Sequence, residues 1–443
     1  MTQNQRKKYR PAPQFLVGKT EAKISSEKTE EIPFSGEDLL VKVFPEILSG
    51  QNFLDAAIKN LESVSKFGVL IVRIDNPGEV SEEALLAQLI EGVGRVIDAF
   101  CSDRKGFWGG LDHGVFGCFF PGADPTSCSQ FAETIQKELA QRRKETLSIG
   151  VATYPTKNYQ KTQILENARK ALDHAAFFGP NSIVSFDAVS LNISGDRFYQ
   201  EGDIQKAVAE FKMALMLDAT NVNVYNSLGV CYGVTGDFNQ ALENFETAIW
   251  LDPSEVMAIY NTGLVYVLMD RKDKALEYFL EAHRIDEEVF EVTFQIGRLY
   301  LDGGEPVEAI AFLERANTMQ PSSGPAARYL GDCLVALNKQ RDGVSAFEKA
   351  IKINPNDAAA LSGLGYLFDA LGENAEIALM FCEKSVEIAP DNGLYRNRLG
   401  RVYIKENRTE DALDQFQKAT ELGHDSTEFI EQIQDDSKED VKN

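Results

Sequence analysis

A glycine recurs at a nearly constant spacing through the second half of the chain, and this spacing constrains the fold more than any other feature. Its positions are Gly195, Gly229, Gly263, Gly297, Gly331, Gly365 and Gly400. A second small residue recurs in the same register, at Ala207, Ala241, Ala275, Ala309, Gly343, Ala378 and Ala412. A bulky residue follows each of these, at Phe211, Phe245, Phe279, Leu313, Phe347, Cys382 and Phe416. Self-similarity with a period of about 34 residues predicts a stack of similar supersecondary units.

One period, from Val222 to Pro253, predicts two amphipathic helices joined by a tight turn at Gly236-Asp237. We expect the glycine of the first helix to let the two helix backbones approach closely, with the bulky residue of the second helix filling the adjacent space. The sixth period carries one extra residue near Asn374. Prolines that stop helix growth stand just past the second helix of several periods, at Pro253, Pro321, Pro355 and Pro390.

These periods resemble tetratricopeptide repeats (TPRs) and cover residues 188–424 as seven repeats. The resemblance implies an all-α TPR solenoid of seven helical hairpins that binds protein partners. One hairpin cannot bury its own apolar face, so neighbouring hairpins must stack on one another.

The charge of the chain limits its partners. The 443 residues carry a formal net charge of −23, which argues against general binding to nucleic acid or to an anionic membrane. Residues 1–35 differ, because they form a polar, basic arm that we expect to be disordered. Residues 425–443 are expected to form an acidic C-terminal helix or tail. The chain shows no membrane-length apolar run and no signal-peptide core, which predicts a cytoplasmic protein.

The cysteines and tryptophans are interpreted as packing residues. The six cysteines show no metal-ligand spacing, so we expect neither a disulfide nor a metal site. Cys231, Cys333 and Cys382 fall at apolar positions of repeat helices. Trp108 and Trp250 are likewise expected in the interior.

Residues 36–187 follow a different pattern from the repeats. Residues 69–75, VLIVRID, predict a strand buried on both faces, and residues 81–101 predict an amphipathic helix. Residues 106–112 and 115–122 predict a hairpin around His113-Gly114. A helix, a strand, a helix and a last strand complete the order βαββαβαβ. This order describes an α/β sandwich with helices against a mainly antiparallel sheet.

The quoted residues of this region resemble a GGDEF domain, the diguanylate cyclase fold. The resemblance rests on LSIGVATYP (147–155), on ILENARKALDHAAFFGPNSIVSF (164–186) and on VFGCFFPG in the hairpin, and it covers residues 40–187. It implies a nucleotidyl cyclase-like sheet and, in the family, a site for GTP and Mg²⁺.

The family's catalytic residues are largely missing from this chain. With Phe116 as the last motif position, Gly114 and Val115 stand where the family has its acidic pair. Arg73 stands in the region of a metal-binding aspartate, and a guanidinium cannot ligate Mg²⁺. Arg169 likewise replaces an aspartate of the family's third helix. We therefore expect a degenerate site with no catalytic residue, no cofactor and no metal, whose remnants are Asp75, Asp112, His113 and Gly114.

In one alternative the protein is an enzyme. A register shift that used Gly109-Gly110-Leu111-Asp112 as the motif would bring Asp112 near a metal. The chain would then be a diguanylate cyclase or a nucleotide-binding enzyme with displaced motifs, using GTP and Mg²⁺. Two-metal phosphoryl transfer needs at least two well-placed carboxylates, and only Asp75 and Asp112 are candidates.

A partner is expected on the first helices of the repeats, whose outward positions line the groove of a TPR solenoid. Within that groove the side chains change from apolar and aromatic to mixed with basic points, which favours a protein or peptide with apolar anchors followed by acidic residues. In the alternative, the groove arginines Arg298, Arg328 and Arg401 pair with nearby Asp302, Asp332 and Asp369 on a solvated face. The candidate groove residues are Asn226, Tyr260, Leu264, Phe294, Arg298, Arg328, Tyr366, Asn397, Arg401 and Lys405.

Together these patterns predict a non-catalytic bacterial-type signalling scaffold. It would bind protein partners through the repeats and carry a GGDEF-like domain that has lost cyclase chemistry. The other non-enzymatic alternative is a TPR co-chaperone or assembly factor. Because the last predicted strand ends at Asp187 and the first repeat begins at about Ala188, we expect the two domains to be rigidly joined.

Overall fold

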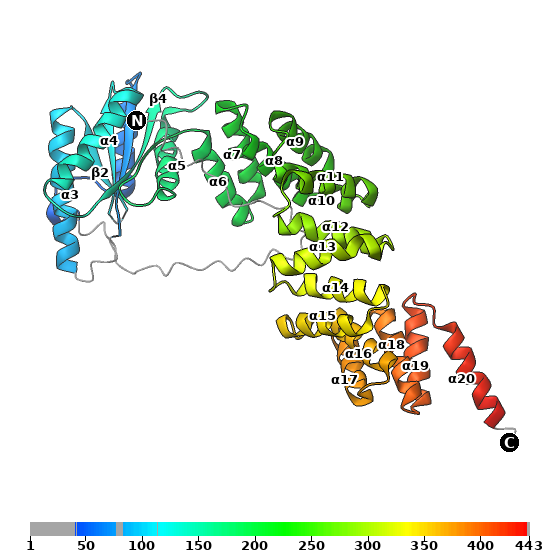
Figure 1. Ribbon diagram of the computed structural model, residues 1–443. Helices are drawn as coiled ribbons and strands as arrows, with labels where there is room; N and C mark the ends of the chain where they lie inside the picture. The colour runs from blue at the N-terminus through cyan, green and yellow to red at the C-terminus, as the bar shows by residue number, and fades with distance from the viewer. Residues whose placement is uncertain (1–39, 41, 77–82, 113, 441–443) are drawn as a thin grey trace. The chain divides into compact units, whose positions relative to one another are not determined.

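The computed structural model of the protein describes residues 40, 42–76, 83–112 and 114–440. The expected basic arm, residues 1–35, and the candidate site residue His113 lie outside these residues. The chain divides into two units between Asn261 and Thr262. The first unit holds a sheet with its helices and the first two helical hairpins, and the second holds further hairpins and a final helix (Figure 1).

A five-stranded sheet organises the first part of the first unit. Its order is β2-β3-β1-β4-β5, with β1 antiparallel to β3 and β4, and β5 parallel to β4. The predicted order βαββαβαβ and the mainly antiparallel sheet are therefore confirmed. The strands are β1 (Phe67–Ile74), β2 (Phe107–Asp112), β3 (Val115–Pro121), β4 (Leu147–Tyr154) and β5 (Ile183–Ser185).

Helices cover both faces of this sheet. One apolar cluster joins α3 (Glu83–Asp103) and α4 (Pro125–Ala140) to the sheet face that carries Leu70 and Val72. A second cluster joins α2 (Gly50–Leu61) and α5 (Ile164–Ala176), preceded by the 3-10 turn η2 (Lys161–Gln163), to the face that carries Val69 and Ile71. Because β1 is covered on both faces, its sequence is a continuous apolar run without alternation.

The sheet passes directly into the first helical hairpin. Strand β5 ends at Ser185 and α6 (Ala188–Gln200) begins three residues later. Asp187 caps α6, since its carboxylate accepts a hydrogen bond from the backbone N–H of Ser190. Phe186 packs against the apolar clusters of both the sheet and the first hairpin. The connection therefore has no flexible linker.

The repeat helices pack as the glycine spacing predicts. A Cβ added at Gly229 of α8 (Val222–Thr235) would lie 2.4 Å from the ring of Phe245 on α9 (Phe238–Leu251), so the glycine is what permits this approach. The equivalent pairs are Gly195 with Phe211, Gly263 with Phe279, Gly297 with Leu313, Gly331 with Phe347, Gly365 with Cys382 and Gly400 with Phe416. The extra residue of the sixth repeat lies beside Asn374, which has a positive φ of 47° at the start of α17.

The helices from α6 to α19 alternate between the first and the second helix of a hairpin. In the first unit α7 (Ile204–Leu217), α8 (Val222–Thr235) and α9 (Phe238–Leu251) follow α6, and α10 (Val256–Leu268) contains the division between units. The second unit continues with α11 (Lys272–Ile285), α12 (Phe290–Asp302), α13 (Pro306–Met319), α14 (Gly324–Ala336), α15 (Gln340–Ile353), α16 (Ala358–Leu371), α17 (Ala375–Ile388), α18 (Gly393–Lys405) and α19 (Thr409–Glu421).

A last helix, α20 (Thr427–Asp440), packs on the end of the final hairpin. Phe429 of α20 stacks on Phe416 of α19, with the ring centroids 4.9 Å apart. Ile433 is buried in the same cluster. The acidic C-terminal segment thus has an apolar inner face. Across the described residues, every helix is too short or too polar to span a bilayer.

Candidate functional site

The β2–β3 hairpin occupies the place of the expected nucleotide motif. Gly110 pairs with Phe116, and a bulge between Gly110 and Asp112 brings Asp112 opposite Val115. Gly114 has a positive φ of 63°, as expected for the turn. The returning strand β3 begins at Val115, and Phe116 is its second residue.

The carboxylate of Asp75 is engaged in hydrogen bonds at the end of β1. Its Oδ2 accepts from the Thr146 hydroxyl and from the backbone N–H of Asn181, both at 2.7 Å. Its Oδ1 accepts from the Ser148 hydroxyl at 2.6 Å. Asp75 thus joins β1 to the start of β4 and to the segment before β5, and this gives it a structural role.

Arg73 and Arg169, which the GGDEF resemblance aligns with aspartates, contribute positive charge near Asp173. Burial raises the pKa of Asp173 on α5, and the charges of Arg197, Arg73 and Arg169 oppose that rise. A site with these arginines repels a divalent cation. Among the described residues, no group of three or more His, Cys, Asp or Glu side chains is placed to hold a metal ion.

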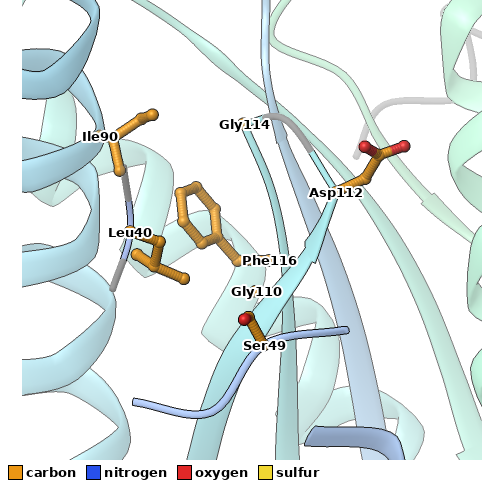
Figure 2. Close-up of a pocket in the computed structure, with 7 residues that line it drawn as sticks. All are labelled: Leu40, Ser49, Ile90, Gly110, Asp112, Gly114 and Phe116. Carbon is orange, nitrogen blue, oxygen red and sulfur yellow. The ribbon is translucent and has the colours of Figure 1, made fainter. Parts of the chain in front are cut away.

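The space beside the hairpin is nearly closed. Figure 2 shows the hollow that includes Asp112 and Gly114, with the side chain of Leu40 next to the ring of Phe116. Its volume is about 10 Å³, which holds about one water molecule. A Cβ on Gly110 would lie 2.6 Å from Leu40, so this glycine permits packing of the segment before α2. The Gly110 N–H donates to the carbonyl of Leu48, which strengthens the same contact.

A second group of polar residues joins the sheet to the first hairpin. The ammonium of Lys170 on α5 lies 2.7 and 2.8 Å from the two carboxylate oxygens of Glu210 on α7. Both side chains are largely buried, at 9% and 17% exposed. Arg197 of α6 pairs with Asp173 at 3.1 Å. His174 Nδ1 lies 3.2 Å from the Ser190 hydroxyl, and both residues are buried.

In the second unit, one predicted groove arginine is already paired. Arg328 on α14 lies 3.3 Å from Asp332 and 3.7 Å from Asp357, and its guanidinium stacks on Tyr329. Here the alternative of paired charges holds. Burial raises the pKa of Asp332 to about 6, although Arg328 and Arg398 oppose the rise. Lys405 is also paired, with Asp369 at 2.8 Å.

A basic and aromatic cluster remains beside these pairs. The guanidinium of Arg401 lies 5.4 Å from the ring centroid of Tyr366 and 6.0 Å from that of Phe429. Arg398, one helical turn earlier, lies 5.0 Å from the same tyrosine ring and donates to the Ser362 hydroxyl at 3.0 Å. Burial lowers the pKa of Arg398, while Asp332 opposes that change. Among the ion pairs formed by the described residues, none includes Arg398 or Arg401.

Arg398 was not among the residues selected from the sequence. It precedes Arg401 by three residues, and this helical spacing was the signal that could have identified it. Both side chains stack on one ring of the preceding inner helix. We call Arg398, Arg401 and Tyr366 the arginine–tyrosine cluster.

Three predicted groove residues are buried instead of open. Asn226 and Tyr260 are 7% and 4% exposed, and Asn397 is 6% exposed. The oxygen of Asn226 accepts a hydrogen bond from the side-chain amide of Asn261, and Asn397 donates to the Ser426 hydroxyl. Asn226 is thus bonded to the first helix of the next repeat and Asn397 to the residue before α20, which leaves little of either amide for a partner.

Of the other predicted groove residues, Lys405 is exposed and the rest are half-buried. Phe294 stacks on Phe290 and meets the edge of Tyr329. Leu264 and Arg298 keep part of their surface exposed, and the Nε of Arg298 is buried without a hydrogen-bond partner among the described residues. Aromatic residues on α12 and α14 thus precede the arginines of α18 within one unit.

The architecture defines a class of protein, a solenoid of helical-hairpin repeats. Sequence families described as "TPR repeat" and "Tetratricopeptide repeat" match residues 195–233 and 222–255, and two further tetratricopeptide families match residues 330–392 and 395–422. The chain therefore contains tetratricopeptide repeats. This family binds proteins or peptides, so the repeat region is a protein-interaction scaffold. All four matches begin at or after residue 195, and the GGDEF resemblance gains no support from them.

Several solved structures are similar over part of the chain. "YrrB: a TPR protein with an unusual peptide-binding site" is 25% identical, covers 42% of this chain and 95% of its own, and has a TM-score of 0.38. MamA is 25% identical over 36% of this chain and 94% of its own, with a TM-score of 0.32. PilF of Pseudomonas aeruginosa is 17% identical over 50% and 97%, with a TM-score of 0.44. A comparison with curated proteins finds no match.

Proposed function

We propose that this protein is a non-catalytic, cytoplasmic scaffold of a bacterial-type signalling pathway. The repeats, residues 188–424, would bind a partner segment with apolar anchors followed by acidic residues. The GGDEF-like domain, residues 36–187, would have lost cyclase chemistry, and the helix within residues 425–443 would close the end of the repeats.

The arginine–tyrosine cluster is the observation that carries the proposal. A stacked guanidinium is held in place while its N–H groups stay available to an acceptor. Arg401 combines this position with the absence of an acidic partner among the described ion pairs. In a chain with a net charge of −23, a cation left unpaired favours an acidic ligand. The aromatic side chains of Phe294 and Tyr329 would take the apolar anchors.

The surroundings of the β2–β3 hairpin support a domain that does not turn over a nucleotide. A nucleotide needs far more room than about 10 Å³, and Asp75 already accepts three hydrogen bonds. Neither Asp75 nor Asp112 lies in a cluster of metal-ligating side chains among the described residues. These observations favour the scaffold over the cyclase with displaced motifs.

Two measurements on the full chain test the proposal. Incubation with GTP and Mg²⁺ should yield neither cyclic di-GMP nor pyrophosphate above a no-protein control. Turnover that Asp75→Asn or Asp112→Asn abolishes would show that the protein is an enzyme and contradict the proposal.

The second measurement concerns the partner. Affinity capture from a bacterial lysate should recover a protein that Arg401→Glu loses and Arg396→Glu retains. Arg396 is a matched control because it lies on the same helix and contacts Gln415 instead of Tyr366.

A further inference from the structure

A cavity lies between α2 and α5, on the sheet face opposite α3 and α4. Its volume is about 140 Å³, close to that of cavities known to take up a benzene ring, about 150 Å³. Apolar side chains form most of its wall, with polar groups from Gln51, Lys161 and Thr162. The apolar wall consists of Leu54, Ala57, Ile58, Leu61, Phe119 and Leu165.

A single cation belongs to this wall. Lys161 donates from its ammonium to the carbonyl oxygens of Leu61 at 3.2 Å and Glu62 at 2.7 Å, at the C-terminal end of α2. These carbonyls fix the position of the ammonium but leave its charge unneutralised. The ammonium also lies 5.7 Å from the ring centroid of Tyr154, and two of its three N–H groups are used by the carbonyls. No ion pair among the described residues includes Lys161.

The wall is open to a ligand on one side. Ala57, Leu61 and Phe119 are almost fully buried and form the floor. Ile58 remains 45% exposed beside the cavity. A ring placed over the floor would cover Ile58 and bury further apolar surface.

We propose that this cavity binds a small aromatic carboxylic acid, with its ring over Phe119 and its carboxylate on Lys161. The size of the cavity favours a ligand with one aromatic ring, and the fixed ammonium of Lys161 favours a negatively charged ligand. A cationic or neutral compound of the same shape would gain the ring contacts without the charge-assisted hydrogen bond. This site is independent of the surface proposed for the protein partner.

Binding at this site would also reach the repeats. Leu165 of the wall lies on α5, and the same helix carries Lys170, which is bonded to Glu210 on the first hairpin. A ligand that fixes α2 against α5 therefore stabilises the unit that contains both the sheet and the first hairpins. The melting temperature of this unit should rise with ligand concentration.

Three probes of similar shape test the proposal on the full chain. They are phenylacetate, 2-phenylethanol and 2-phenylethylamine, followed through the methyl resonances of Leu54, Ile58 and Leu165. Phenylacetate should bind saturably, with a Kd on the order of 0.1–1 mM for a ligand of this size. It should bind about tenfold more tightly than the neutral or cationic probe.

Matched variants separate the cation from the cavity. Lys161→Met should bring phenylacetate to the affinity of 2-phenylethanol, while Lys59→Met, on the exposed side of α2, should leave the difference intact. Leu54→Phe should fill the cavity and abolish binding of all three probes, with Ile58→Trp as a second filling variant at a more exposed position. Equal affinities for the three probes, or an affinity for phenylacetate that survives Lys161→Met and both filling variants, would overturn the proposal. Absence of saturable phenylacetate binding would do the same.

Discussion

Lys170 Nζ on α5 and Glu210 Oε1 on α7 lie 2.7 Å apart. This ion pair joins a helix that covers the sheet to the first helical hairpin. The pair is bidentate and largely buried. Removing one partner of such a pair leaves the other charge buried and unpaired. Replacing both partners with apolar residues restores packing.

Lys170→Met should therefore destabilise the first unit by about 3 kcal/mol, because Glu210 is left buried and unpaired. The double variant Lys170→Met/Glu210→Leu should recover most of that loss. Chemical unfolding can be followed by the fluorescence of Trp108, which is buried in the sheet core, in a Trp250→Phe background. A single variant as stable as the parent would show that the pair does not join the two parts. Rapid proteolysis between residues 185 and 195 of the parent, with both halves surviving, would point the same way.

Gly229→Ala should destabilise the repeats. Its Cβ would stand 2.4 Å from the ring of Phe245, and such overpacking costs about 1–3 kcal/mol. The gain in helix propensity, about 1 kcal/mol, offsets only part of this. Gly92→Ala on α3 is the control, because its Cβ meets only the flexible side chain of Arg143. Circular dichroism melting of both variants gives the comparison, and equal melting temperatures would contradict the packing account.

The contribution of Asp332 to the stability of the second unit should fall as pH rises from about 4 to about 6. Asp332 keeps its proton in the folded state up to a pKa of about 6, because burial disfavours its charged form, whereas the unfolded chain releases that proton near 4. The folded state therefore binds more protons in this interval, and its advantage is lost as pH increases. Asp332 is 37% exposed, so solvent screening limits the effect to about 1 kcal/mol. Asp332→Asn should flatten this slope, and an unchanged slope would assign the pH dependence to other groups.

The thiols should be inert in the native protein. All six cysteines are buried and free. Burial raises the pKa of Cys128, Cys231 and Cys382 to about 12, so the reactive thiolate is scarce at pH 8. Titration with an aromatic disulfide reagent should detect fewer than about one thiol per native chain, and all six after denaturation. Rapid reaction of several thiols in the native protein would show that the repeat cores open readily.

The repeats could be predicted from sequence because each contact that defines them is local. Gly229 and Phe245 are sixteen residues apart, and a glycine faces a phenylalanine, leucine or cysteine at nearly the same spacing in every period. The order of strands and helices in the α/β part followed from a clear change of periodicity. The hairpin predicted around His113-Gly114 corresponds to strands β2 and β3, which end at Asp112 and begin at Val115.

Other features depended on contacts between distant residues. The donors to Asp75 lie more than seventy residues away, so its hydrogen-bonding role had no local signal. Asn226 and Asn397 were expected in an open groove, but close approach of neighbouring helices buries them. Trp250 was expected in the interior and is 79% exposed, because its position near the end of α9 faces away from the neighbouring helices. Arg398 became visible only through its contact with Tyr366.

The central claim is that the arginine–tyrosine cluster of the repeats binds an acidic segment. The most direct measurement is fluorescence anisotropy of a labelled peptide in which Leu and Phe precede a run of Glu, with a Gln counterpart as the neutral probe. We expect the full chain to prefer the acidic peptide, and Arg401→Ala to weaken it by about tenfold with little change in melting temperature. Arg396→Ala should keep the parent affinity. If Arg401→Ala binds the acidic peptide as tightly as the parent at both low and moderate salt, the cluster is not the binding surface.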